Sequence, residues 1–100
     1  MKNPFENLDK TLEHSVRLRI ISVLAANESY DYSALKELLA LTDGNLATHM
    51  KSLEREKYIS IAKSFIDRKP HTRYKITEKG RIAFRKHLDA MAELIRLQKR

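Results

Sequence analysis

Several hydrogen-bonding side chains in the middle of the chain share one face of an expected helix. Asn45, Thr48, His49 and Ser52 have a spacing at which residues three or four positions apart are neighbours on a helix surface. An amide can form two hydrogen bonds with adenine, hydroxyl groups can donate or accept, and the threonine methyl group can contact thymine. This face is therefore suited to reading bases in a DNA major groove, or it is an ordinary solvated helix face.

Groups suited to binding phosphate lie around the same face. Gly44 has no side chain, so the N–H groups at the helix start can approach a phosphate, where the helix dipole also favours an anion. Ser33 can act in the same way at the start of the preceding helix. Lys51 and Arg55 lie farther along and are better placed for phosphates than for bases. His49 either contacts DNA, packs beside the helix or hydrogen-bonds a backbone carbonyl.

A second basic element follows the expected helix. Apolar and polar residues alternate over residues 58–66 and again over 73–77, which predicts a β-hairpin with residues 67–72 as its connection. An extended basic tip suits contact with the DNA backbone or minor groove, and alternatively such charges discourage aggregation through a sheet edge. The basic side chains of this segment are Arg68, Lys69, His71 and Arg73, with Lys75 at the base.

The charge of the chain is unevenly distributed. The formal net charge is +7 over 100 residues. Residues 1–42 carry 5 basic and 6 acidic side chains, whereas residues 43–100 carry 15 basic and 7 acidic ones. The C-terminal part therefore produces a positive field suited to a polyanion, with nucleic acid the first expectation and an anionic membrane the second.

The N-terminal half must supply the helices that support these elements. Asn3 is the expected N-cap of a first helix, and Ser15 is the expected N-cap of a second, strongly apolar one. Residues 27–31 lack apolar periodicity and predict a loop. Ser33 is then expected to cap a short helix over residues 34–40.

Two further caps define the helices on either side of the hairpin. Thr42 is the expected N-cap of the helix that carries Asn45, and its predicted buried stripe is Leu46, Met50 and Leu53. Thr77 is expected to cap a last long helix. The predicted fold class is mainly α with a small β-hairpin wing, in a single domain over residues 1–100.

Three segments in this order resemble the winged helix-turn-helix transcriptional regulators of the MarR-like and ArsR-like superfamily. Residues 15–24 are similar to an "R-L-x-I-L-x-x-L" helix, and residues 46–54 to an "S-x-H-L-x-x-L" recognition helix. Residues 74–81 are similar to a "Y-x-L-T-x-x-G" join between wing and final helix. The resemblance runs from Leu12 to about Leu97 and implies a recognition helix that binds duplex DNA.

The chain departs from the family pattern in three ways. It has no cysteine, so the cysteine pairs of metal-sensing members are absent, and Ala47 stands where a serine is frequent. It is also short beside larger MarR-like proteins, which build a ligand pocket between extra helices. The class of any small-molecule effector therefore stays open.

The ends of the chain predict self-association. Apolar residues of the last helix repeat at a spacing near 3.5, and a core this small does not use all of them. With apolar residues near the N-terminus they are expected to form a two-fold interface within residues 1–14 and 78–100, or else the two terminal helices pack together within one chain. A two-fold dimer would place its recognition helices about 34 Å apart and predicts an inverted-repeat operator. The expected interface residues are Phe5, Leu8, Leu12, Phe84, Leu88, Met91 and Ile95.

Other chemistry finds little support in the sequence. The four histidines are scattered, and no catalytic Ser/His/Asp order, phosphate-binding glycine loop or metal-ligand spacing occurs. No enzyme activity, metal or cofactor is expected, and the absence of an apolar leader or span predicts a cytoplasmic protein with no membrane partner. The sequence therefore predicts a homodimeric, sequence-specific regulator, most simply a repressor. The alternatives are a winged-helix module for protein interaction and a non-specific binder of duplex DNA or RNA.

Overall fold

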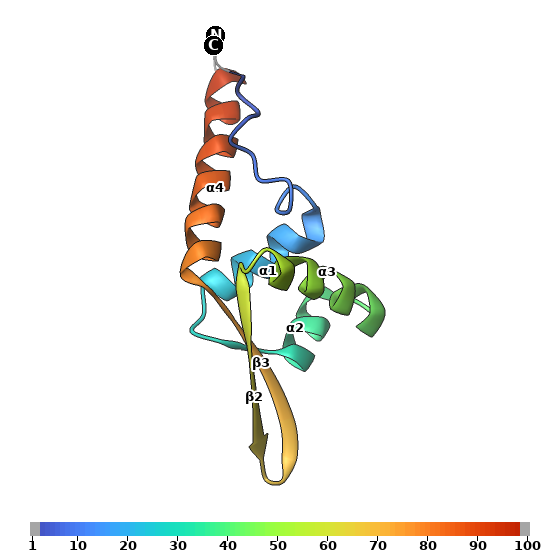
Figure 1. The fold of residues 1–100 in the computed structure, drawn as a ribbon. Helices are drawn as coiled ribbons and strands as arrows, with labels where there is room; N and C mark the ends of the chain where they lie inside the picture. Colours follow the sequence, from blue (N-terminus) through green and yellow to red (C-terminus); the bar gives the residue numbers. More distant parts are fainter. Residues whose placement is uncertain (1–2, 99–100) are drawn as a thin grey trace.

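The computed structural model describes residues 3–98 and shows a winged helix (Figure 1). Three helices form a central body, a hairpin projects from one side of it, and the last helix extends in the opposite direction. The molecule is therefore elongated, with principal-axis extents of 58 × 26 × 21 Å. The elements in chain order are α1 (Ser15–Ala25), β1 (Tyr30–Asp31), α2 (Tyr32–Leu39), α3 (Asp43–Arg55), β2 (Ile59–Ile66), β3 (Lys69–Ile76) and α4 (Glu78–Gln98).

The core lies where the three short helices meet the base of the hairpin. The predicted stripe of α3, Leu46, Met50 and Leu53, is confirmed, because each of these side chains is at most 1% exposed. Burying side chains of this size stabilises the fold by about 1.5–3 kcal/mol each. The other core residues are Leu12, Ile20, Ile21, Leu24, Leu35, Tyr58, Ile59, Tyr74 and Ile76. This core fixes the orientation of α3 and of the wing relative to each other.

Two of the predicted helix caps are confirmed. The Thr42 hydroxyl oxygen accepts a hydrogen bond from the Asn45 backbone N–H at 3.2 Å, which starts α3 as expected. The Thr77 hydroxyl oxygen accepts from the Gly80 backbone N–H at 2.9 Å and starts α4. Local hydrogen bonding of this kind can be read directly from sequence because both partners lie within one turn.

Two further caps lie one and two residues earlier than predicted. His14, not Ser15, caps α1, with its Nδ1 accepting from the Val16 backbone N–H at 3.2 Å. Asp31, not Ser33, caps α2, and its carboxylate accepts from the Ala34 backbone N–H at 3.1 Å. A carboxylate is also favoured at this position by the helix dipole.

The helix predicted from Asn3 onward is wrong, since residues 3–14 form successive turns, the first of which run beside α4 (Figure 1). The Asn3 side chain accepts from the Phe5 N–H, and the Asp9 carboxylate accepts from the N–H groups of Thr11 and Leu12. These side chains offer the backbone local partners that compete with helical hydrogen bonds. Of the predicted dimerisation ranges, residues 1–2 and 99–100 lie outside the described residues.

Asp9 ties the N-terminal segment to two distant elements. Its carboxylate accepts a hydrogen bond from the Tyr58 hydroxyl at 2.5 Å, and its backbone N–H donates to Nδ1 of the buried His87 in α4 at 2.9 Å. Burial first, and then the hydrogen bond to Asp9, raise the pKa of the Tyr58 hydroxyl. Both bonds hold the segment against the junction of wing and α4.

The sheet has three antiparallel strands in the order β1-β3-β2. The predicted loop over residues 27–31 is partly wrong, because Tyr30 and Asp31 pair with Tyr74 and Arg73. Such a short strand is defined by its remote partner and leaves no local periodicity. Within residues 3–98 no helix has the length and apolarity needed to cross a membrane.

The hairpin turn is shorter than predicted. Only Asp67 and Arg68 connect the strands, with φ values of 51° and 66°. Two-residue turns with positive φ at both positions match the natural twist of a hairpin. Residues 69–72, predicted to lie in the connection, therefore belong to β3, and Pro70 lies opposite Phe65.

Candidate nucleic-acid interface

The outer face of α3 presents the polar residues singled out in the sequence. Asn45 and Thr48 are exposed, and a Cβ atom added at Gly44 would meet nothing within 4 Å. Lys51 and Arg55 are also exposed, farther along the same helix. The start of α3 is therefore open to a ligand, as a recognition helix requires.

The two hydroxyl groups on α3 have their protons engaged. The Thr48 hydroxyl donates to the Gly44 carbonyl oxygen at 2.9 Å, and the Ser52 hydroxyl donates to the Thr48 carbonyl oxygen at 3.3 Å. Their oxygen lone pairs remain available to accept hydrogen bonds. Because Ser52 is half-buried and Thr48 is exposed, Thr48 is the better placed of the two to accept from a base amino group.

His49 is held by α1 and the segment before it. Its Nδ1 lies 3.3 Å from an Arg17 guanidinium nitrogen, and its ring centroid lies 4.3 Å from that of His14. Arg17 also donates to the Thr11 carbonyl oxygen at 2.6 Å. Arg17 therefore braces the N-terminal segment against α3. The same contact occupies one of the two ring nitrogens that His49 could offer to DNA.

This environment predicts a pH-dependent contribution of His49 to stability. Burial, followed by the charges of His14 and Arg17, lowers the pKa of His49 below its ordinary value of 6.5. Between the pKa of His49 in the folded chain and 6.5, the unfolded chain therefore binds more protons than the folded chain. The contribution of His49 to stability is fully present above pH 6.5 and is lost as the pH falls through its folded-state pKa.

Denaturant unfolding of the native chain and of His49→Gln, between about pH 7.5 and about pH 5.5, measures this contribution. The difference in unfolding free energy, native minus variant, is expected to shrink as the pH falls. A difference that stays constant or grows toward low pH would contradict the assignment.

Helix α2 makes contacts with the start of α3 that the sequence did not reveal. Ser33 is exposed in the first turn of α2. Nearby, the Lys36 ammonium lies 3.0 Å from the Asp43 carboxylate, and the Tyr32 hydroxyl donates to the Asp43 carbonyl oxygen at 3.4 Å. Lys36 thereby offsets a negative charge next to Gly44, where a phosphate would approach. The pair joins two helices, so no local sequence pattern predicts it.

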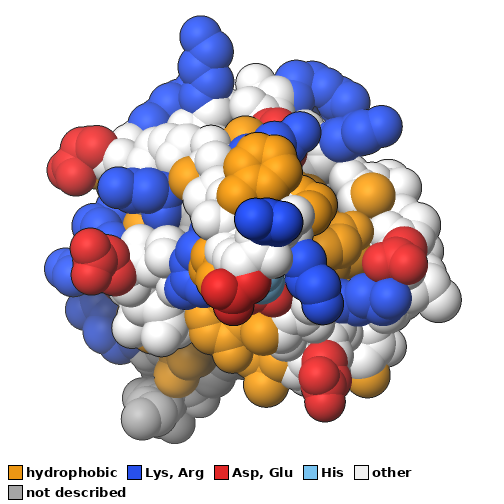
Figure 2. Space-filling view, turned by 90° about the horizontal axis from the view of Figure 1, so that it is seen from below, with side chains coloured by type: hydrophobic (Ala, Val, Ile, Leu, Met, Phe, Trp, Pro, Cys, Tyr) orange, Lys and Arg blue, Asp and Glu red, His pale blue; other side chains and the backbone are white. Residues whose placement is uncertain are grey.

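The basic residues of the hairpin divide into two groups. Arg68 and Lys69 are exposed at the tip, and Lys63, which no sequence motif marks as a DNA contact, is exposed on β2 behind them. His71 lies nearer the body, 3.7 Å from the Asp31 carboxylate. Viewed from the side of the hairpin tip, hydrophobic side chains near the centre lie beside Lys and Arg side chains, with Asp and Glu side chains among and around them (Figure 2).

Arg73 is engaged within the protein. Its Nε donates to the Ser29 hydroxyl at 2.8 Å, and an Nη donates to the Ser29 carbonyl oxygen at 3.2 Å. Arg73 therefore holds the hairpin to the segment before β1. Free cationic groups for phosphate are supplied by the tip residues.

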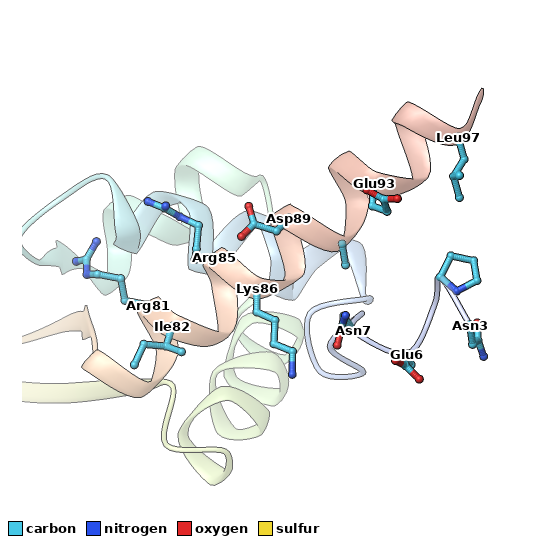
Figure 3. Close-up of a pocket in the computed structure, with 12 residues that line it drawn as sticks. Asn3, Glu6, Asn7, Arg81, Ile82, Arg85, Lys86, Asp89, Glu93 and Leu97 are labelled. Atoms are coloured by element: carbon cyan, nitrogen blue, oxygen red, sulfur yellow. The ribbon is translucent and has the colours of Figure 1, made fainter. Parts of the chain in front are cut away.

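A groove of about 880 Å³ lies between the N-terminal segment and α4 (Figure 3). Asn3, Glu6 and Asn7 line one side of it, and residues of α4 from Arg81 to Leu97 line the other. Of the residues expected at a dimer interface, Phe5 and Ile95 are 59% and 58% exposed. Leu88 is also exposed, whereas Leu8, Phe84 and Met91 are half-buried.

Leu12 corrects the expected interface. Its side chain is 0% exposed and lies in the core of its own chain. Leu12 was expected at the interface as part of a predicted first helix, and the structure has turns in this segment. A partner chain therefore cannot reach Leu12 on this surface.

Comparison with known proteins finds similarity over most of the chain. A family model described as winged helix DNA-binding domain matches residues 16–95. The uncharacterized protein MJ0432 of Methanocaldococcus jannaschii is 39% identical over 85 residues, which are 85% of this chain and 92% of that relative.

Solved structures show the same fold. A transcriptional regulator homologue from Pyrococcus horikoshii OT3 matches with a TM-score of 0.84 and 30% identity, covering 90% of this chain and 89% of that one. A MarR-family transcriptional regulator from Silicibacter pomeroyi matches with a TM-score of 0.65 and 17% identity, covering 96% and 67%. The transcriptional repressor BigR from Xylella fastidiosa matches with a TM-score of 0.63 and 20% identity, covering 91% and 82%. The last two likenesses concern the fold alone.

Proposed function

Because the chain belongs to the family of winged helix DNA-binding domains, we propose that it is a sequence-specific transcriptional regulator that binds double-stranded DNA as a homodimer. Its family and fold are those of transcriptional regulators and not of enzymes. The observation that carries the proposal is the open start of α3, where Gly44, Asn45 and Thr48 are exposed together above a buried stripe. In this arrangement α3 enters the major groove, and the basic tip of the hairpin contacts the DNA beside it.

The contacts divide between base reading and positioning. Asn45 and Thr48 provide the groups that distinguish bases, as donor, acceptor and methyl contact. Lys51 and Arg55 bind phosphates and set the register without reading sequence. The N–H groups at the start of α3, beside Gly44, add a further phosphate contact.

Dimerisation is supported by apolar side chains that are exposed along α4 and on the N-terminal segment. Ile82 and Ile95 of α4 are 62% and 58% exposed, and Phe5 of the N-terminal segment is 59% exposed. Exposed large apolar side chains of this kind are typical of a surface that a protein partner covers. A two-fold axis there would leave both recognition helices free on the same side, and occupation of an operator would repress transcription by blocking it.

Selection of bound duplexes from a random DNA pool tests this proposal. We expect an inverted repeat with half-sites one helical turn apart. Enrichment of a single half-site would contradict the dimer, and no enrichment would contradict sequence-specific binding. Affinity that falls steeply with salt for every sequence would instead indicate non-specific binding, and no affinity for DNA would indicate a protein-interaction module.

The hairpin tip predicts a change in salt dependence. Each phosphate contact that is lost lowers the slope of log affinity against log salt by about 0.9 for duplex DNA. The double variant Arg68→Ala with Lys69→Ala is therefore expected to lower the slope by about 2 and to weaken binding to all DNA sequences alike. Lys86→Ala, which removes one charge at the groove beside α4, is the control and should leave the slope unchanged. A double variant with the native slope would contradict a DNA contact by the tip.

A further inference from the structure

The hairpin carries an apolar face beyond the part that the core uses. Residues paired across β2 and β3 share a face, and alternate pairs lie on the same side of the hairpin. On one side the pairs are Ile59 with Ile76, Ile61 with Tyr74, Lys63 with Thr72 and Phe65 with Pro70. The first of these pairs is buried, whereas Phe65 is 76% exposed. The last pair therefore has no packing role within the described chain.

The position of Phe65 explains why the fold does not cover it. β2 is an outer strand of the sheet, and its residues from Ser60 to Ile66 are all exposed. Tyr74 is the buried residue of β3 that lies nearest the tip, and the hairpin extends about 20 Å beyond it at the usual rise per residue. The tip thus stands clear of the helices (Figure 1).

Positive charge surrounds this exposed ring. Lys63 lies two residues before Phe65 on the same face, and Arg68 and Lys69 follow at the turn. Asp67 is the only acidic residue between positions 59 and 76, a range that contains five Lys and Arg residues. The ligand that fits an apolar ring with a cationic surround combines stacked rings with negative charge, as a nucleic-acid duplex does.

We propose that Phe65, with Pro70 beside it, is an apolar wedge that enters the DNA minor groove and partly unstacks one base step, thereby bending the duplex. The inference rests on the proposed DNA-binding function and adds a contact that reads DNA deformability. Phe and Pro are among the side chains that act as such wedges, and the resulting kinks are about 20–90°. Arg68 and Lys69 would bind the phosphates on either side of the opened step.

The wedge gives the protein a sequence preference at a position that makes no base-edge hydrogen bond. Pyrimidine–purine steps such as TA and CA unstack most easily. The operator is therefore expected to contain such a step outside the bases read by α3, where the hairpin lies. Replacing that step with a stiff one should weaken DNA binding by the native chain and leave DNA binding by Phe65→Ala unchanged.

The test measures DNA bending with the selected operator, by fluorescence energy transfer between the ends of the duplex. The native chain is expected to bend the duplex and Phe65→Ala to leave it nearly straight, with about tenfold weaker binding, the loss that follows from one aromatic stack. Phe65→Leu retains an apolar wedge and should keep most of the bend. Ile66→Ala is the matched control, since Ile66 is 51% exposed on the same strand but faces the other side of the hairpin.

A second arm uses duplexes in which the step is already opened by a mismatch. The native chain is expected to bind the mismatched duplex more tightly than the paired one, because the unstacking cost is lower, and Phe65→Ala should not discriminate. Native bending by Phe65→Ala, or equal losses in Phe65→Ala and Ile66→Ala, would overturn the wedge while leaving the DNA-binding function intact. If the native chain does not bind DNA, the proposed function fails first. If Phe65→Ala abolishes a self-association seen by sedimentation without DNA, the ring is a protein contact and the wedge is overturned.

Discussion

Replacing Gly80 with alanine is expected to lower the free energy of unfolding by about 3 kcal/mol or more. A Cβ atom at this position would overlap the Tyr58 carbonyl oxygen, and it would lie 2.8 Å from the carbonyl carbon and 3.0 Å from the Ile76 side chain. These atoms belong mostly to backbone, so no side chain can rotate to relieve the contact. The first turn of α4 would have to move away from Tyr58, the residue that directly precedes β2.

The same carbonyl group resists such a movement. It accepts a hydrogen bond from the Thr77 backbone N–H at 2.9 Å, at the start of α4. The Tyr58 side chain is in turn held by Asp9. Relief of the overlap therefore breaks contacts that join the wing, α4 and the N-terminal segment.

Thermal unfolding of Gly80→Ala and Gly44→Ala measures the effect with a control of the same chemistry. A chain of this size loses about 4–8 °C in Tm for each kcal/mol. Gly80→Ala should therefore unfold more than about 12 °C below the native chain, whereas Gly44→Ala, with nothing near the added Cβ, should change the unfolding free energy by about 1 kcal/mol at most. A Tm of Gly80→Ala equal to that of the native chain would show that this packing is wrong.

Asn45→Ala is expected to weaken binding to the selected operator by about 10- to 100-fold while leaving binding to scrambled DNA unchanged. A bidentate pair between an amide and adenine contributes about 1–3 kcal/mol of discrimination. The backbone of Asn45 is fixed by its hydrogen bond to the Thr42 cap, and its side chain is exposed. The substitution therefore removes the amide without disturbing the helix.

Titration of operator and scrambled duplexes with Asn45→Ala and Lys51→Ala separates reading from positioning. Lys51→Ala should weaken both duplexes alike and reduce the salt slope by about 1. Asn45→Ala should reduce the ratio of the two affinities. If Asn45→Ala loses the same affinity for both duplexes, its side chain contacts the DNA phosphate backbone and not a base. If it loses no affinity, the side chain lies outside the interface.

The parts of the fold that sequence predicted depend on local patterns. Thr42 and Thr77 cap helices through N–H groups three residues away, and the stripe of Leu46, Met50 and Leu53 follows from helical periodicity. The exposure of Asn45 follows from the same periodicity, because its position lies outside the buried stripe of the helix. The order of elements then identified the winged helix.

The parts that sequence missed depend on contacts between distant residues or on side chains that compete with the backbone. The N-terminal turns form because Asn3 and Asp9 bind nearby N–H groups, and a capping pattern alone does not distinguish this from a helix. Arg73 was assigned to DNA by its charge, yet Ser29, 44 residues away in the chain, accepts its hydrogen bonds. Charge and spacing identify which side chains can contact DNA, whereas tertiary contacts decide which of them remain free.

Reading of DNA sequence by α3 is tested by competition between the selected operator and scrambled DNA. At about 150 mM salt, where non-specific binding is weak, the native chain is expected to prefer the operator by at least about 1,000-fold. Asn45→Ala should lose most of this preference. Equal affinity of the native chain for both duplexes would show that α3 does not read DNA sequence.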